Sequence, residues 1–144
     1  MNAEQTRSIV VERLIPYPAE KIWRALTVPE FLAEWLMEND FALKLGHRFT
    51  FRAKPVPGWS GVTNCEVVEM EEPYLLSYRW GDGTESDTGL QTLVTWTLTA
   101  ADGGTLVRME HSGFRPADEV GYHGMGSGWP RILERLERAV AALD

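Results

Sequence analysis

His111 is the residue of this sequence best suited to chemistry, because an imidazole gains or loses a proton near neutral pH. It follows a segment in which Val107 and Met109 share its face and Arg108 and Glu110 occupy the other. This alternation is typical of a β-strand with one buried face, so we expect His111 to point into the protein. Two interpretations stay open: a hydrogen-bonded core group, or a side chain that contacts a ligand or acts as a general base.

Catalysis by His111 would require a second titratable group within hydrogen-bonding reach, and the strand pattern does not place one. Arg13, Glu66 and Tyr78 are the candidates, because each lies in a strand-like segment. Each of them fits an outward register as well as an inward one. We therefore assign no catalytic residue from the sequence.

The other reactive side chains form no pattern that would hold a metal ion or a cofactor. His47 and His123 lie in separate turns, and Cys65 has no cysteine partner, so metal-ligand spacing is absent and Cys65 is expected to be a small buried residue. Ser127 lacks the strand and spacing of a nucleophile elbow, and no Lys-Ser/Thr follows Gly124–Gly128 as in a phosphate loop. We expect no metal and no cofactor.

Large apolar side chains form the second group of candidates, because six Trp residues are many for 144 positions. They come from segments expected to converge on one helix, and they are either ordinary core or the lining of an apolar ligand pocket. Indole N–H groups buried in such a pocket need an acceptor, which a ligand could provide. With His111, the candidate ligand-binding residues are Trp35, Phe49, Phe51, Trp59, Trp80, Trp96, Met109, Phe114, Met125, Trp129 and Leu133.

The element that must position these residues is a helix predicted from about Gly128 to Leu143. Its large apolar residues recur in steps of three and four, so they share one stripe. Ser127 is a predicted cap, and Pro130 suits a first helical turn, where no N–H is needed. At about 1.5 Å per residue, such a helix is long enough to cross a small sheet.

Upstream of that helix, the patterns predict a strand ending at Ile15, two short helices from Ala19 and Pro29, and about six further strands. Phe41–Leu43 is predicted as one short strand, and Asp102-Gly103-Gly104 as a hairpin turn. Because the strands follow one another through short turns, the sheet should be largely antiparallel. We predict an α+β fold in which a curved antiparallel sheet wraps one helix.

Four glycines between Gly121 and Gly128 precede the predicted helix. Glycine accepts large changes of φ and ψ, so this stretch could gate access to a pocket. An irregular loop that packs tightly and needs left-handed glycines explains the same residues equally well.

Composition limits the function classes. The length suits one domain, 1–144, and the net charge of −7 without any basic cluster argues against nucleic-acid binding. We find neither a signal peptide nor an apolar run long enough to insert into a membrane, so we expect a cytoplasmic protein. Val56 and Leu90 are apolar residues that could serve a homodimer interface.

Several segments in their order along the chain resemble one known family. They are Pro16-Tyr17-Pro18-Ala19-Glu20-Lys21-Ile22-Trp23-Arg24-Ala25-Leu26, then Gly61–Pro73 followed by Leu76 and Trp80, then Thr95–Leu98 with Gly103-Gly104-Thr105, His111–Phe114 and Gly128-Trp129. Together they resemble the Hsp90-ATPase-activator-homologue group of the START-like helix-grip superfamily. The resemblance implies a seven-stranded antiparallel sheet that grips the C-terminal helix, with a hydrophobic cavity between them.

Three functions are compatible with this resemblance. The first is non-catalytic binding of a small hydrophobic or aromatic ligand in the cavity. The second is a START-like enzyme of the cyclase, dehydratase or hydrolase type that uses His111. The third is a co-chaperone that activates the Hsp90 ATPase, although the eukaryotic activators carry an additional N-terminal domain without a counterpart in these 144 residues.

Overall fold

The computed structural model describes residues 5–55, 57, 60–81 and 90–143, and its centre is one antiparallel sheet. The strand order is β1-β7-β6-β5-β4-β3-β2, so each strand from β2 to β7 pairs with its neighbours in sequence and β1 closes against β7. The strands are β1 (Arg7–Ile15), β2 (Glu38–Asn39), β3 (Arg48–Arg52), β4 (Val62–Glu71), β5 (Leu75–Gly81), β6 (Gln91–Ala101) and β7 (Gly104–Phe114).

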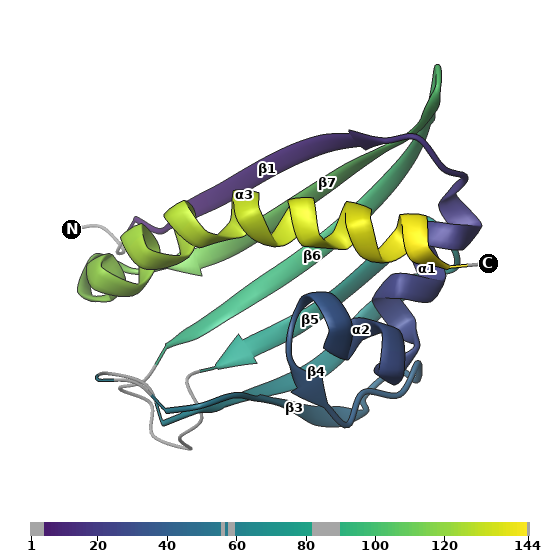
Figure 1. Cartoon of the computed structure of the whole chain (residues 1–144). Helices are drawn as coiled ribbons and strands as arrows, with labels where there is room; N and C mark the ends of the chain where they lie inside the picture. The colour runs from purple at the N-terminus through teal and green to yellow at the C-terminus, as the bar shows by residue number, and fades with distance from the viewer. Residues whose placement is uncertain (1–4, 56, 58–59, 82–89, 144) are drawn as a thin grey trace.

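Helices cover one face of this sheet (Figure 1). They are α1 (Ala19–Thr27), α2 (Pro29–Trp35) and the long α3 (Glu119–Ala142), which is preceded by a 3-10 turn, η1 (Pro116–Asp118). α3 lies along the sheet, and α1 and α2 sit near its C-terminal end (Figure 1). The predicted helix-grip fold is confirmed. No helix among the described residues is long and apolar enough to cross a membrane.

Strand alternation gives the sheet an inner face towards the helices and an outer face towards solvent. On β6, Thr92, Val94 and Trp96 are buried and face inwards, and the residues between them are only half-buried. The β6–β7 hairpin turns at Gly103 and Gly104, where a side chain on Gly104 would collide with the backbone of Ile15. The register therefore fixes which side chains reach α3.

The predicted strand at Phe41–Leu43 is wrong, because side chains of the preceding residues take over the hydrogen bonds of this segment. The Asn39 Oδ1 atom accepts the N–H of Phe41 at 3.1 Å, and the carboxylate of Asp40 accepts the N–H of Thr50 at 2.6 Å. The Thr50 N–H is also the main reason why the pKa of Asp40 lies below its usual value. Only Glu38–Asn39 pairs as strand β2, against Arg52 and Phe51.

The start of the long helix differs from the prediction as well. α3 begins at Glu119, so Ser127 and Pro130 lie inside it, and the Ser127 hydroxyl donates to the Gly124 carbonyl rather than capping a helix end. The glycine-rich stretch is therefore helical and not an irregular loop. Its half-buried Tyr122 and Met125 continue the apolar stripe upstream at helical spacing, which explains why the helix extends there.

Candidate functional site

Aromatic rings form a continuous wall between the sheet and α3. Phe51 of β3 contacts Trp80 of β5 with ring centroids 5.5 Å apart, and Trp80 contacts Trp129 of α3 at 5.8 Å. Phe114, at the end of β7, lies 4.6 Å from the ring of His111, which is 5.8 Å from Trp129. These separations lie within the range of favourable ring pairs. We call Phe51, Trp80, His111, Phe114 and Trp129 the aromatic wall.

His111 sits in the middle of this wall, and both of its ring nitrogens are hydrogen-bonded. The indole N–H of Trp129 donates to Nδ1 at 3.0 Å, so Nδ1 carries no proton. The hydroxyl of Thr92 donates to the carbonyl of Trp80 at 3.0 Å and lies 2.7 Å from Nε2, from which it therefore accepts. The network defines a neutral imidazole with its proton on Nε2.

Burial lowers the pKa of His111 to about 3. The hydrogen bonds act in the same direction, because a proton on Nδ1 would face the N–H of Trp129 with no acceptor between them. At neutral pH the ring is uncharged, and its single lone pair is occupied. His111 would have to lose the hydrogen bond from the Trp129 indole before its Nδ1 atom could accept a proton as a base.

The three groups considered as partners of His111 lie apart from it. Glu66 is on the outer face, where its carboxylate lies 3.9 Å from Arg79. Tyr78 faces inwards but is separated from His111 by Val94 in the register, so the two strands are about 10 Å apart. Arg13 also faces the helix layer and binds Glu137 of α3 at 2.6 Å.

Burial raises the pKa of the Tyr78 phenol, whose oxygen accepts the indole N–H of Trp96 at 3.0 Å. Trp35 likewise donates to the carbonyl of Ala25 at 2.9 Å. The indole N–H groups of Trp35, Trp96 and Trp129 all donate to protein acceptors, so none of them needs a ligand as its hydrogen-bond acceptor. Among the described residues, the buried side-chain polar atom without a partner is the indole nitrogen of Trp23 on α1.

The structure places most of the predicted ligand-binding residues on the inner side of the sheet or on the facing side of α3. Met125 is half-buried, and Trp59 lies outside the described residues. The buried members are Trp35, Phe49, Phe51, Trp80, Trp96, Met109, His111, Phe114, Trp129 and Leu133. Sequence reasoning missed Thr92 and Tyr122. A threonine on the otherwise apolar face of a strand was the available signal for Thr92.

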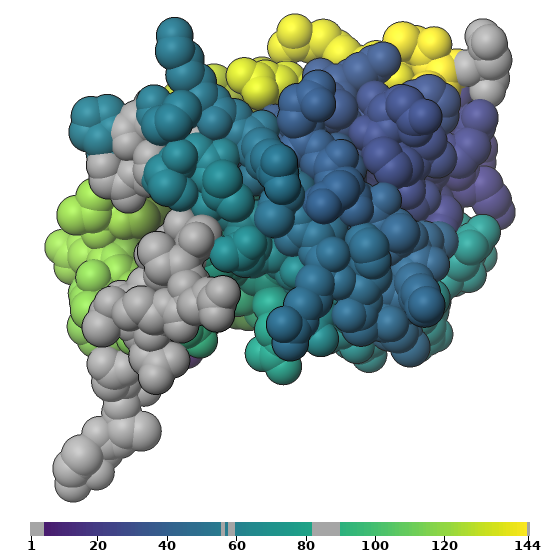
Figure 2. All heavy atoms as spheres, turned by 90° about the horizontal axis from the view of Figure 1, so that it is seen from below, coloured from purple at the N-terminus to yellow at the C-terminus, as the bar shows by residue number. Residues whose placement is uncertain are grey.

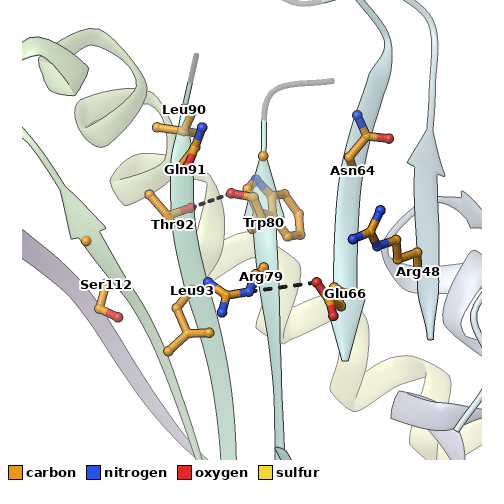
Figure 3. Close-up of a pocket in the computed structure, with 12 residues that line it drawn as sticks. Arg48, Asn64, Glu66, Arg79, Trp80, Leu90, Gln91, Thr92, Leu93 and Ser112 are labelled. Carbon is orange, nitrogen blue, oxygen red and sulfur yellow. Dashed lines mark hydrogen bonds and ion pairs between the residues drawn. The ribbon is translucent and has the colours of Figure 1, made fainter. Parts of the chain in front are cut away.

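A groove of about 570 Å³ lies on the outer face, over the ends of β5 and β6 (Figure 3). Gly81, which pairs with Gln91, contributes no side chain to the groove lining. The Arg79–Glu66 pair also lines the groove (Figure 3). Thr92, a buried polar side chain at its edge, is already engaged by Trp80 and His111. The groove thus has the character of a solvated sheet face, where an exposed ion pair contributes about 0–1 kcal/mol.

Two smaller hollows lie elsewhere on the described surface. One of about 400 Å³ adjoins the groove around Arg48 and Asp40, and one of about 300 Å³ lies beside the Arg13–Glu137 pair. The last of these lies at the edge between β1 and α3, and none of the three is lined by His111, Phe114 or Trp129, so the predicted interior cavity stays a prediction. Within the part of the chain that the structure describes, no group of three or more His, Cys, Asp or Glu side chains could hold a metal ion.

Comparison with known proteins gives one family match and many matching structures. The sequence model of the family described as "Activator of Hsp90 ATPase homolog 1-like protein" matches residues 16–141. The crystal structure of protein MLL2253 from Mesorhizobium loti is 45% identical, with a TM-score of 0.86, and the match covers 96% of this chain and 99% of that one. No curated protein matches the chain.

Two further structures are more distant. Protein BH1534 from Bacillus halodurans is 29% identical over 96% of this chain and 99% of its own, with a TM-score of 0.77. The Aha1 dimer from Colwellia psychrerythraea is 21% identical over 93% of this chain and 96% of its own, with a TM-score of 0.79, and this last likeness shows the fold alone.

Proposed function

The chain belongs to the activator of Hsp90 ATPase homolog 1-like family, and from this premise we propose that it binds a small hydrophobic or aromatic ligand without transforming it. The ligand lies against the aromatic wall, between the inner face of the sheet and α3. The observation that carries this proposal is the unbroken series of ring contacts from Phe51 to Phe114. Aromatic and apolar linings are what small-molecule sites in proteins most often present.

Hydrogen bonding within the wall supports a binding role over catalysis. The bonds to both nitrogens of His111 hold the wall in one arrangement, and they leave the imidazole without a lone pair for proton abstraction. A ligand held here gains affinity from apolar area, at roughly 25 cal/mol per Å², and from ring stacking. The preferred ligand is accordingly flat and largely apolar.

A fluorescence titration with 1-anilinonaphthalene-8-sulfonate tests the proposal, together with native mass spectrometry of the purified protein for a co-purified ligand. The wall variant Phe51→Leu should weaken probe binding about tenfold, because it removes a ring contact and apolar area. The control is Leu26→Val on α1, which shortens an equally buried side chain outside the wall. Absence of saturable binding, or equal losses in both variants, would refute the proposal.

Self-association is a separate proposal for this chain, suggested by the dimer named for the Colwellia protein. Size-exclusion chromatography with light scattering measures it directly.

A further inference from the structure

The first ten residues of α3, 119–128, are held much more weakly than the rest of the helix. We call this segment the arm. All the fully buried side chains of α3 lie beyond it, at Trp129, Leu133, Leu136 and Val140. Within the arm, Tyr122 and Met125 are half-buried, and Val120 is 89% exposed. In Figure 1 the arm lies at the end of the molecule away from α1 and α2, and in Figure 2 its light-green atoms lie at the edge of the molecule opposite the purple N-terminal segment.

Glycine weakens the arm further, although packing does not require glycine there. A Cβ atom added at Gly121, Gly124 or Gly128 would meet nothing within 4 Å, and one at Gly126 would only touch the Ile9 side chain at 3.9 Å. A glycine in a helix reduces helix stability relative to alanine by a factor of roughly two to five. Each of these glycines therefore lowers the free energy needed to unwind the arm.

A break in the helix hydrogen bonds separates the arm from the packed part of α3. Pro130 has no N–H, so the carbonyl of Gly126 cannot receive the usual bond from the fourth residue along. At the other end, the side chain of Asp118 holds the backbone N–H of Arg115 at 2.7 Å and its guanidinium at 3.0 Å. The arm can therefore unwind while both of its ends stay in place.

Geometry allows the arm to bow outwards. Ten residues span about 15 Å as a helix and up to about 33 Å when extended. Among the described residues, Arg7 holds the arm down by lying over the Tyr122 ring at 4.0 Å and by pairing with Glu119 at 3.8 Å in a solvent-exposed contact. Tyr122 itself packs edge-on against Phe114 at 5.4 Å.

The residues beneath the arm lead directly to the aromatic wall. Ile9 and Phe114 are buried under Gly126 and Tyr122, and Phe114 contacts His111. We propose that the arm is a gate, whose local unwinding uncovers Ile9 and Phe114 and admits an apolar ligand to the wall. The inference that the arm unwinds depends only on its burial, its glycines and Pro130, whereas the passage of a ligand rests on the proposed function.

Hydrogen exchange of the whole protein tests the unwinding without a ligand. Amides of residues 123–129 should exchange at least tenfold faster than those of 133–140. The triple variant Gly121→Ala, Gly124→Ala, Gly128→Ala should slow arm exchange roughly ten- to a hundredfold, because each alanine favours the helix and meets open space. Arg135→Ala, at an exposed position in the packed part, should leave arm exchange unchanged.

Thiol labelling tests whether the unwinding uncovers the wall. A cysteine in the variant Ile9→Cys lies under the arm and should react through its opening, whereas the native buried Cys65 on β4 reports any wider opening of the molecule. The triple alanine change should slow labelling at position 9 by the same factor as arm exchange, with no effect at Cys65. Stopped-flow association of 1-anilinonaphthalene-8-sulfonate should slow equally, with an unchanged dissociation constant.

The outcomes separate the two proposals. If the arm amides exchange as slowly as those of 133–140, or if the alanine changes affect Cys65 as much as position 9, the arm is not a gate. If the arm opens but probe association is unaffected by the alanine changes, the ligand takes another route and the gate is refuted. If no probe binds at all, the proposed function fails, and exchange and labelling alone decide whether the arm opens.

Discussion

His111 should make the stability of this protein depend on pH in the range between its two pKa values. The imidazole titrates near 6.5 in the unfolded chain and near 3 in the folded one, so below pH 6.5 the unfolded state binds the extra proton. The contribution is complete above pH 6.5 and is lost as the pH falls towards 3. At pH 5 the loss is about 2 kcal/mol relative to pH 8.

Urea unfolding at pH 8 and pH 5 measures this effect when the variant His111→Gln is compared with the native chain. The variant should be less stable at pH 8, and its stability should change less between the two pH values, because it lacks the buried imidazole whereas all other ionisable groups are common to both proteins. Equal pH dependence in the two proteins would mean that His111 is protonated as readily in the folded state as in the unfolded one.

The buried tryptophans offer a matched test of hydrogen bonding. Replacing Trp129 by Phe leaves Nδ1 of His111 as a buried acceptor without a donor, which costs about 1–3 kcal/mol beyond the lost apolar area. Replacing Trp23 by Phe removes an N–H that has no partner, although the residue is only 4% exposed. We expect Trp23→Phe to cost at least about 1 kcal/mol less than Trp129→Phe in urea unfolding. Equal costs would show that the Trp129–His111 bond contributes little.

At the scale of elements, the ion pair between Arg13 of β1 and Glu137 of α3 attaches the packed part of the helix to the edge of the sheet. Its atoms are 2.6 Å apart and its side chains are 37% and 30% exposed, so a coupling energy of about 0.5–1 kcal/mol is expected. The variants Arg13→Met and Glu137→Gln in a double-mutant cycle measure it. High salt should reduce it.

The pair Arg138–Glu134 within α3 provides the control, because it is 4.0 Å long and Arg138 is 77% exposed. Its cycle should give a smaller coupling energy. A larger value for the control, or none for Arg13 and Glu137, would contradict the assignment of the β1–α3 contact to this ion pair.

The elements themselves were predictable where side-chain period and turn residues agree, as at β1, α1, α2, β3 and the β6–β7 hairpin. The prediction was wrong where tertiary contacts outweigh local preference. Gly121 to Gly128 favour a loop by propensity, but Tyr122 packs on Phe114 and the helix extends through them. The sequence also could not show that Asp40 disrupts the strand predicted after it, because the partner of its carboxylate, Thr50, is ten residues away.

For the candidate site, the sequence predicted inward positions but could not predict partners. Alternation placed His111 on the buried face correctly, whereas its bonds to Trp129 and Thr92 depend on how α3 is docked and on the register of β6 against β7. Arg13, Glu66 and Tyr78 were ambiguous for a related reason: a one-residue change of register reverses the face of a strand residue.

At the scale of the whole molecule, the two faces of the sheet differ in burial and polarity. The inner face carries the core shared by β-strands and helices, and the outer face carries polar groups such as the exposed Arg79 and the half-buried Glu66. A ligand on the aromatic wall should depend on inner-face residues and not on the groove of Figure 3. Thermal unfolding distinguishes these two locations.

A ligand that binds only the folded state at a hundred times its dissociation constant adds about 2.7 kcal/mol to the free energy of unfolding. For a chain of 144 residues this corresponds to a rise in Tm of roughly 5–10 °C. With 1-anilinonaphthalene-8-sulfonate at one fixed concentration, Phe51→Leu should lose a large part of this rise, because its affinity is lower. Arg79→Gln, on the outer face, should keep it. A rise that disappears in Arg79→Gln and persists in Phe51→Leu would place the probe in the outer groove and refute binding at the wall.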